Sequence, residues 1–191
     1  MPQDMSHLFK DLPTIETERL TLRKILPQDD EDIFAYASDP DVASFVSWSV
    51  HKTIDDSRAY VRYVQDRYER GLPESWAIYL KARRRVVGTI GFVNYAPEHA
   101  RAELGYALAR RHWNQGLTTE AAVAVKAWAF GTMGLNRIDA LCMVENVAST
   151  RVMERIGMKY EGLLRGYVYW KDHYHDLKIY SMLRSDYEGE S

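Results

Sequence analysis

The chain has 191 residues, of which 46% are hydrophobic and 27% charged, so it can bury a core and is too charged for a membrane protein. Its formal net charge of −2 lacks the basic surplus with which nucleic-acid binders neutralise phosphates, so we expect no nucleic-acid partner. This length predicts a single domain over residues 1–191, with a loose lead-in over 1–13.

The compartment is predicted from what the sequence lacks. Cys142 is the single cysteine, which excludes an internal disulfide and a cysteine-cluster metal site. The N-terminus has no apolar stretch of the secretory type, and no apolar run approaches the ~20 residues of a membrane span. We therefore expect a cytoplasmic protein that does not enter a membrane.

The first half of the chain predicts one strand, two helices and three further strands. Residues 20–23 alternate between apolar and polar, as in a strand. Pro27 and the acids that follow it predict a helix over 27–37, because carboxylates suit the positive end of a helix dipole. An amphipathic pattern predicts a second helix over 53–70. A period of two then indicates strands at 75–80, 86–93 and 102–108.

The second half alternates between helices and strands. An alanine-rich stretch predicts a helix over 119–132, and strand 138–144 and helix 147–156 follow it. An aromatic hairpin over 158–169 and 173–183 ends the chain. This order predicts an α/β fold with a mixed sheet, helices on both faces and a right-handed parallel crossover from about 102 to 144.

A loop between a strand and a helix indicates an anion site. Gly116 stands just before the helix, where the first backbone N–H groups have no internal partner and the helix dipole favours negative charge. Thr118 and Thr119 add hydroxyl donors, so a phosphate or pyrophosphate would suit this turn. The P-loop lysine and the three glycines of a dinucleotide fingerprint are both missing. A tight turn with nothing bound is the alternative.

Several segments in a fixed order carry a resemblance that spans nearly the whole chain. They are Ile15-Glu-Thr-Glu-Arg-Leu-Thr-Leu-Arg23, Trp113-Asn-Gln-Gly-Leu-Thr-Thr-Glu-Ala121, Glu145-Asn-Val-Ala-Ser149 with 152–157, Gly162-Leu-Leu-Arg-Gly-Tyr167 and 175–183. Together they resemble the GNAT superfamily of acyl-CoA-dependent N-acyltransferases, and most of all its RimJ/RimL-like branch, which acetylates N-termini of ribosomal proteins. The resemblance implies a twisted, mostly antiparallel sheet of about seven strands with one parallel splayed pair. It is also compatible with a homodimer.

The resemblance further implies acetyl-CoA as co-substrate and no metal. It assigns the CoA pyrophosphate to the loop made of Trp113, Asn114, Gln115, Gly116, Leu117, Thr118 and Thr119. A backbone N–H on the strand that ends at Leu108, from Tyr106 or Ala107, would polarise the thioester carbonyl. Trp113 in the first place of the loop is usual in this branch, whereas Thr118 in the last place departs from the superfamily pattern.

Three side chains are candidates for the chemistry, each with a structural alternative. Glu103 is the candidate general base, or else a solvated strand residue. Asn146 would bond to the pantetheine arm, a role compatible with capping the following helix. Ser149 would stabilise the departing thiolate, or else be an ordinary first-turn serine. The superfamily's tyrosine acid is replaced by Met153, which cannot donate a proton.

Amine acidity narrows the class of acceptor. An α-amino group has a pKa near 7.7–8.0 and a lysine near 10.4, so a modest base suits an α-amine, or a small amine of similar pKa, better than a lysine. The resemblance to the RimJ/RimL-like branch implies a protein N-terminus as acceptor, with a small amine or a non-catalytic acyl-CoA-binding module as alternatives. Four aromatic residues could line an acceptor groove or pack in the core, and His112 is expected at the surface. These aromatic residues are Tyr167, Tyr169, Trp170 and Tyr174.

Overall fold

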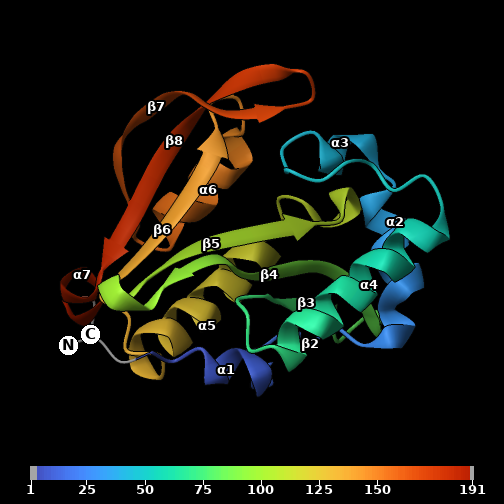
Figure 1. The fold of residues 1–191 in the computed structure, drawn as a ribbon, viewed down its shortest axis with the longest axis horizontal. Coiled ribbons are helices and arrows are strands. Elements are labelled where there is room, and N and C mark those ends of the chain that lie inside the picture. Colours follow the sequence, from blue (N-terminus) through green and yellow to red (C-terminus); the bar gives the residue numbers. More distant parts are fainter. Residues whose placement is uncertain (1–3, 190–191) are drawn as a thin grey trace.

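A computed structural model describes residues 4–189, which contain an eight-stranded sheet in the order β1-β2-β3-β4-β5-β6-β8-β7 (Figure 1). Neighbouring strands are antiparallel, except that β5 and β6 are parallel. The predicted mixed sheet and its parallel crossover are therefore confirmed, with one more strand than the seven expected. The strands are β1 (Ile15–Glu16), β2 (Leu20–Lys24), β3 (Ser75–Leu80), β4 (Arg85–Ala96), β5 (Arg101–Leu108), β6 (Arg137–Met143), β7 (Lys159–Trp170) and β8 (His173–Leu183).

Helices cover both faces of the sheet. Trp128 of α5 packs against Trp76 and Phe92 on one face, while α2 and α4 pack together over the other face of β4. None of the helices within residues 4–189 has the length and apolar character needed to cross a membrane. The helices are α1 (His7–Lys10), α2 (Asp30–Ala37), α3 (Pro40–Ala43), α4 (Ile54–Glu69), α5 (Leu117–Gly131), α6 (Val147–Arg155) and α7 (Arg184–Glu188).

The parallel strands β5 and β6 pair over a short distance only. Their ladder consists of Arg101 with Arg137, Ala102 with Ile138, and Glu103 with Asp139, although both strands continue beyond it. After Glu103 the two strands diverge, β5 staying beside β4 and β6 beside β8 (Figure 1). The sheet therefore opens into a V, and the unpaired edges of β5 and β6 face the gap.

The acids near residue 30 have the structural role that the sequence predicts. Asp29 ends a single 3₁₀ turn before α2, accepts a hydrogen bond from the Leu26 N–H at 2.7 Å and pairs with Arg23. Asp32 accepts from the Val86 N–H at 2.8 Å and so ties α2 to β4. Both carboxylates therefore stabilise the fold, and their hydrogen bonds are made to groups of the protein itself.

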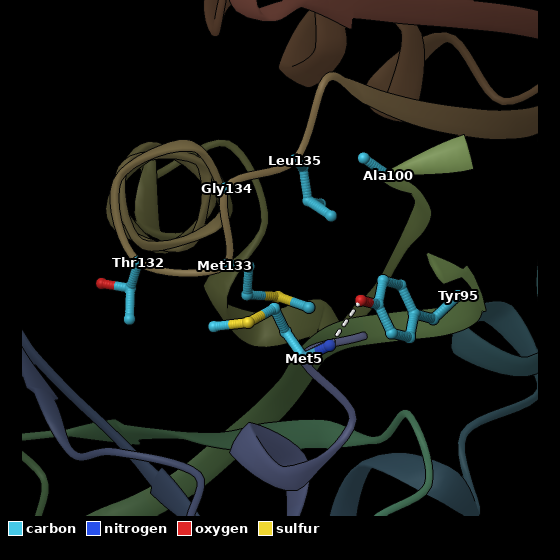
Figure 2. Close-up of a pocket in the computed structure, with 7 residues that line it drawn as sticks. All are labelled: Met5, Tyr95, Ala100, Thr132, Met133, Gly134 and Leu135. Carbon is cyan, nitrogen blue, oxygen red and sulfur yellow. Dashed lines mark hydrogen bonds between the residues drawn. The ribbon is translucent and has the colours of Figure 1, made fainter. Parts of the chain in front are cut away.

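The expected loose lead-in is wrong for the part of it that the structure describes. Helix α1 lies within it, and the ring of Phe9 is fully buried with edge contacts to Phe92 and Tyr95. The backbone N–H of Met5 donates to the Tyr95 hydroxyl at 3.0 Å, beside a hollow of about 180 Å³ near the end of α5 (Figure 2). Residues 1–3 lie outside the described range. The segment is packed because Phe9 inserts its ring against the aromatic side chains of Phe92 and Tyr95 on β4.

We predict that Phe9→Ala lowers the free energy of unfolding by roughly 3–5 kcal/mol, because it removes a buried aromatic ring and leaves a cavity. Denaturant unfolding would measure the loss. His7→Ala, an exposed change on the same helix, should alter stability by less than about 0.5 kcal/mol. Equal effects of the two changes would show that α1 contributes nothing to the core.

Candidate active site

A cavity of about 550 Å³ occupies the gap between β5 and β6 and continues beneath α3 and α4. It contains all but one of the residues predicted for the site, although they come from separate stretches of the chain. Glu103 lies where the strands part, and the loop before α5 and the start of α6 form opposite walls. The predicted residues that line it are Glu103, Tyr106, Ala107, Leu108, Trp113, Asn114, Gly116, Leu117, Thr118, Thr119, Asn146 and Ser149.

The turn before α5 is built from two left-handed residues. Asn114 has φ 59° and Gly116 has φ 75°, a conformation that glycine adopts without strain. The helix therefore begins at Leu117, two residues earlier than predicted, and no side chain caps its first N–H groups. The buried Thr119 hydroxyl has no hydrogen-bond partner within the described residues. Free donors at a helix N-terminus and an unsatisfied buried hydroxyl fit an oxygen-rich anion.

Glu120 fixes this turn to the start of the sheet. Its carboxylate accepts from the Thr17 hydroxyl at 2.6 Å, from the Arg19 N–H at 2.8 Å and from Arg19 Nε at 2.6 Å. Partial burial acts to raise the pKa of Glu120, but these hydrogen bonds and the charge of Arg19 lower it overall. The opening segment of the chain therefore holds the first turn of α5 in place.

Gln115 is the predicted site residue that does not line the cavity. Its side-chain amide donates to the Arg111 carbonyl at 2.9 Å, and its own carbonyl accepts from Arg19 Nη1 at 2.9 Å. The indole N–H of Trp113 donates to the Leu108 carbonyl at 2.7 Å. Gln115 and Trp113 thus shape the loop through contacts with the protein itself.

Asn146 and Ser149 open α6 on the opposite wall. The Asn146 side chain accepts from the Ser149 N–H at 3.0 Å, which is a helix N-cap. The Ser149 hydroxyl oxygen lies 2.7 Å from the phenol oxygen of Tyr106 on β5. Met153 is fully buried in the core. The Ser149 and Tyr106 hydroxyls are therefore paired with each other at this wall, where Asn146, Arg151 and Arg155 also line the cavity.

Glu103 is half-buried at the point where β5 and β6 part. Burial raises the pKa of its carboxyl group, the nearby charge of Asp139 raises it further, and Arg101 partly opposes both. Within residues 4–189 neither a hydrogen bond nor a salt bridge holds this carboxylate. Its basicity is therefore greater than that of an exposed glutamate.

The family resemblance implies that helices within residues 31–70 flank the acceptor cleft, but the side chains that line the half of the cavity beneath α3 and α4 were not predicted from the sequence. Aromatic side chains line it, and Glu74 lies among them, paired with Arg67 at 3.0 Å. Burial raises the pKa of Glu74, against the effect of Arg67. The aromatic residues are Phe45, Trp48, Tyr60 and Tyr63. They follow no motif, and only the packing of α4 against the sheet brings them to the site.

Two expectations for the surroundings of the site need correction. His112 is buried and lines the cavity, because the 3₁₀ turn Arg110–His112 that follows β5 directs its side chain inward. Tyr167, Tyr169 and Tyr174 do not pack in the core, since each is more than half exposed on the β7–β8 hairpin. Of the four aromatic residues singled out on this hairpin, Trp170 lines the cavity.

The tip of this hairpin approaches α3, as Figure 1 shows. Lys171 donates to the carbonyls of Ala43 and Ser44, the latter at 3.2 Å. The cavity is therefore bounded by both arms of the V and bridged at its open end.

Comparison with known proteins agrees with this geometry. The sequence model of the acetyltransferase (GNAT) domain matches residues 19–159, which is most of the chain. The uncharacterized N-acetyltransferase YoaA of Bacillus subtilis (strain 168) is 33% identical over 172 residues, covering 90% of this chain and 97% of YoaA. The chain belongs to the GNAT acetyltransferase family and is an N-acetyltransferase.

Two further proteins are similar to the chain, one of them of known structure. A GNAT-family acetyltransferase from Bacillus anthracis, known from its crystal structure, has a TM-score of 0.81 and 33% identity, covering 91% of this chain and 99% of that one. The ribosomal-protein-serine acetyltransferase of Escherichia coli (strain K12) is 28% identical over 129 residues, covering 68% of this chain and 71% of the relative. The predicted family and its GNAT-like fold are confirmed.

We predict that Glu120→Gln weakens acetyl-CoA binding by about 3- to 10-fold and lowers the unfolding free energy by about 1–2 kcal/mol, because charge-assisted hydrogen bonds to the loop are lost. Calorimetry and denaturant unfolding would measure these effects. Because the folded-state pKa of Glu120 is lowered, the stability difference exists above pH ~4.5 and disappears as the pH falls through the folded-state value. The exposed change Glu69→Gln serves as control, and equal acetyl-CoA affinities of the two variants would contradict the prediction.

Proposed function

We propose that the enzyme transfers the acetyl group of acetyl-CoA to an α-amino group, that of a protein N-terminus. One observation carries the proposal. A half-buried carboxylate of raised pKa, Glu103, shares a cavity with a helix N-terminus whose first N–H groups are uncapped. The transfer of an acyl group from acyl-CoA to an amine requires both a base and an anion-binding site.

The residues present fit acetyl-CoA, which would supply an acetyl group activated as a thioester. The backbone N–H groups at the start of α5 and the unpartnered Thr119 hydroxyl would bind the pyrophosphate. Asn146 would bond to the pantetheine arm from the opposite wall. An N–H of Tyr106 or Ala107, on the strand edge facing the gap, would donate to the thioester oxygen.

Glu103 would receive the proton that the attacking amine must lose. About a tenth of an α-amine of pKa near 8 is already neutral at pH 7, against well under a thousandth of a lysine. Because the pKa of Glu103 is raised, it is a stronger base than an exposed glutamate. Its pKa is therefore closer to that of an α-amine, which favours proton transfer between the two groups. Ser149 would then donate a hydrogen bond to the departing sulfur.

The acceptor half of the cavity supports an amine attached to an uncharged group. The ionic side chains in this half are Arg67 and Glu74. They are already paired with each other, and Arg67 also donates to the Pro73 carbonyl. Neither is left as a free counter-ion for a second charge on the acceptor. A peptide N-terminus has no adjacent carboxylate, unlike a free amino acid. The name of the Escherichia coli relative, which acts on a ribosomal protein, agrees with this choice.

The acceptor is tested by thiol release from acetyl-CoA with N-terminal peptides of ribosomal proteins. We expect turnover with free α-amines and none with the same peptides blocked at the N-terminus but carrying a lysine. A panel of amino acids and small amines is run in parallel. Turnover of small amines with no peptide accepted would overturn the protein substrate while keeping the acetyltransferase.

We predict that Glu103→Gln lowers kcat roughly 100-fold and leaves the Kd of acetyl-CoA unchanged, because a general base contributes about 10²–10⁴ to the rate. In the wild type, kcat at saturating acceptor should fall as the pH drops through the raised pKa of Glu103, above the ordinary value of 4.5. This acid limb should be missing in the variant. Glu98→Gln, an exposed change, should behave as wild type. A variant that keeps the wild-type kcat and acid limb would exclude Glu103 as the base.

A further inference from the structure

The hydroxyls of Tyr106 and Ser149 meet at the gap where β5 and β6 are no longer paired. Tyr106 lies three residues beyond Glu103, the last β5 residue paired with β6. Continued pairing in the same register would bring Tyr106 beside Cys142. Instead, its phenol oxygen lies 2.7 Å from Ser149 Oγ on α6. Both residues line the cavity, so this contact belongs to the wall where the sulfur of CoA would arrive.

The geometry limits how the two protons can be arranged. The Tyr106 O–H can donate to Ser149 Oγ at 2.7 Å or to the Ser149 carbonyl at 3.3 Å. The N–H bond from Ser149 to Asn146 fixes the backbone position of the serine, and the contact with Tyr106 fixes the direction of its side chain. When Tyr106 donates to Oγ, the Ser149 proton is released from the pair. It can then point to another acceptor in the cavity.

We propose that Tyr106 is a positioning residue that, by donating to Ser149 Oγ, directs the Ser149 proton at the sulfur of CoA. This inference rests on the proposed function, because it assumes that acetyl-CoA occupies the cavity. Met153 on α6 is buried and has no proton to donate, so the hydrogen bond to the sulfur must come from another residue. The hydroxyl pair supplies a donor from β5 and α6 together.

The step balances without transfer of the tyrosine proton. The amine nitrogen bonds to the thioester carbon, its surplus proton passes to Glu103, and the C–S bond breaks with its electron pair on sulfur. The Ser149 hydroxyl hydrogen-bonds to the resulting thiolate, and Tyr106 strengthens that bond by polarising the serine. Solvent later protonates the thiolate. Burial raises the pKa of Tyr106, so the phenol keeps its proton throughout.

Two further titratable groups lie close to the pair. Cys142 on β6 lines the same wall, and burial raises the pKa of its thiol, so it stays neutral near pH 7. Lys178 on β8 acts on Cys142 from behind and donates to the Val144 carbonyl at 3.1 Å. The Cys142 thiol also interacts with the Ser149 hydroxyl, which lowers the pKa of that thiol against the effect of burial. A thiol is a weak donor and acceptor, so the 2.7 Å hydrogen bond between the Tyr106 and Ser149 oxygens has the stronger influence on the direction of the serine proton.

The test compares the binding of CoA with that of desulfo-CoA, which lacks the sulfur, by calorimetry at pH 6.5 and 9.5. A thiol ionises near pH 8.5, so the preference for CoA over desulfo-CoA should rise with pH in the wild type. In Tyr106→Phe we expect that rise to shrink by about 3- to 10-fold, with desulfo-CoA binding unchanged. In a Ser149→Ala background, Tyr106→Phe should have no further effect, because the tyrosine acts through the serine.

Tyr160→Phe is the matched control, because it deletes a phenol oxygen from an exposed ring on β7. A Tyr106→Phe enzyme that keeps the full wild-type rise overturns the inference. So does one that loses affinity for both ligands equally, since the tyrosine would then only support packing. A wild-type enzyme that binds neither ligand would instead overturn the use of acetyl-CoA, and the inference with it.

Discussion

The site depends on one event in the sheet, the end of pairing between β5 and β6 after Glu103 and Asp139. Each strand keeps a full ladder on its other side, so the divergence leaves the fold intact. Its cost falls on the backbone N–H and C=O groups that now face the gap, because buried polar groups need partners. A polar, extended ligand arm can supply those partners. The defect in the sheet is therefore what makes this place suitable for binding.

The carboxylates around the cavity fall into two kinds. Glu120 and Glu74 are each bonded to an arginine, and their charges serve the structure. Glu103 has no such partner within the described part of the chain, and the negative charge of Asp139 nearby makes its ionised form still less favourable. A partly buried carboxylate without a partner lowers the stability of the fold, whereas a carboxylate paired with an arginine does so less. That cost is explained if the carboxylate must remain free to take a proton.

Local signals predicted the α5 turn and the α6 cap, because Gly116 and Asn146 determine backbone geometry within a few residues. They also predicted β5, β6, α5 and α6, which form one half of the site. They could not predict α1, whose four residues are too few for a period, or the burial of Phe9. Nor could they place Trp48 and Tyr63 in the cavity, because only the docking of α4 against the sheet brings them there.

The spacing of Glu103 and Tyr106 explains how one strand would serve both ends of the proposed reaction. Residues an odd number apart on a strand point to opposite faces, so the carboxylate and the phenol lie on different sides of β5. The phenol meets α6, where the sulfur would leave, and the carboxylate is on the face that α2 and α4 cover. The peptide N–H groups between them lie in the plane of the sheet. A slip of one residue in the β4–β5 register would exchange the two faces, so the buried ladder that fixes this register also fixes which face of β5 carries each proposed role.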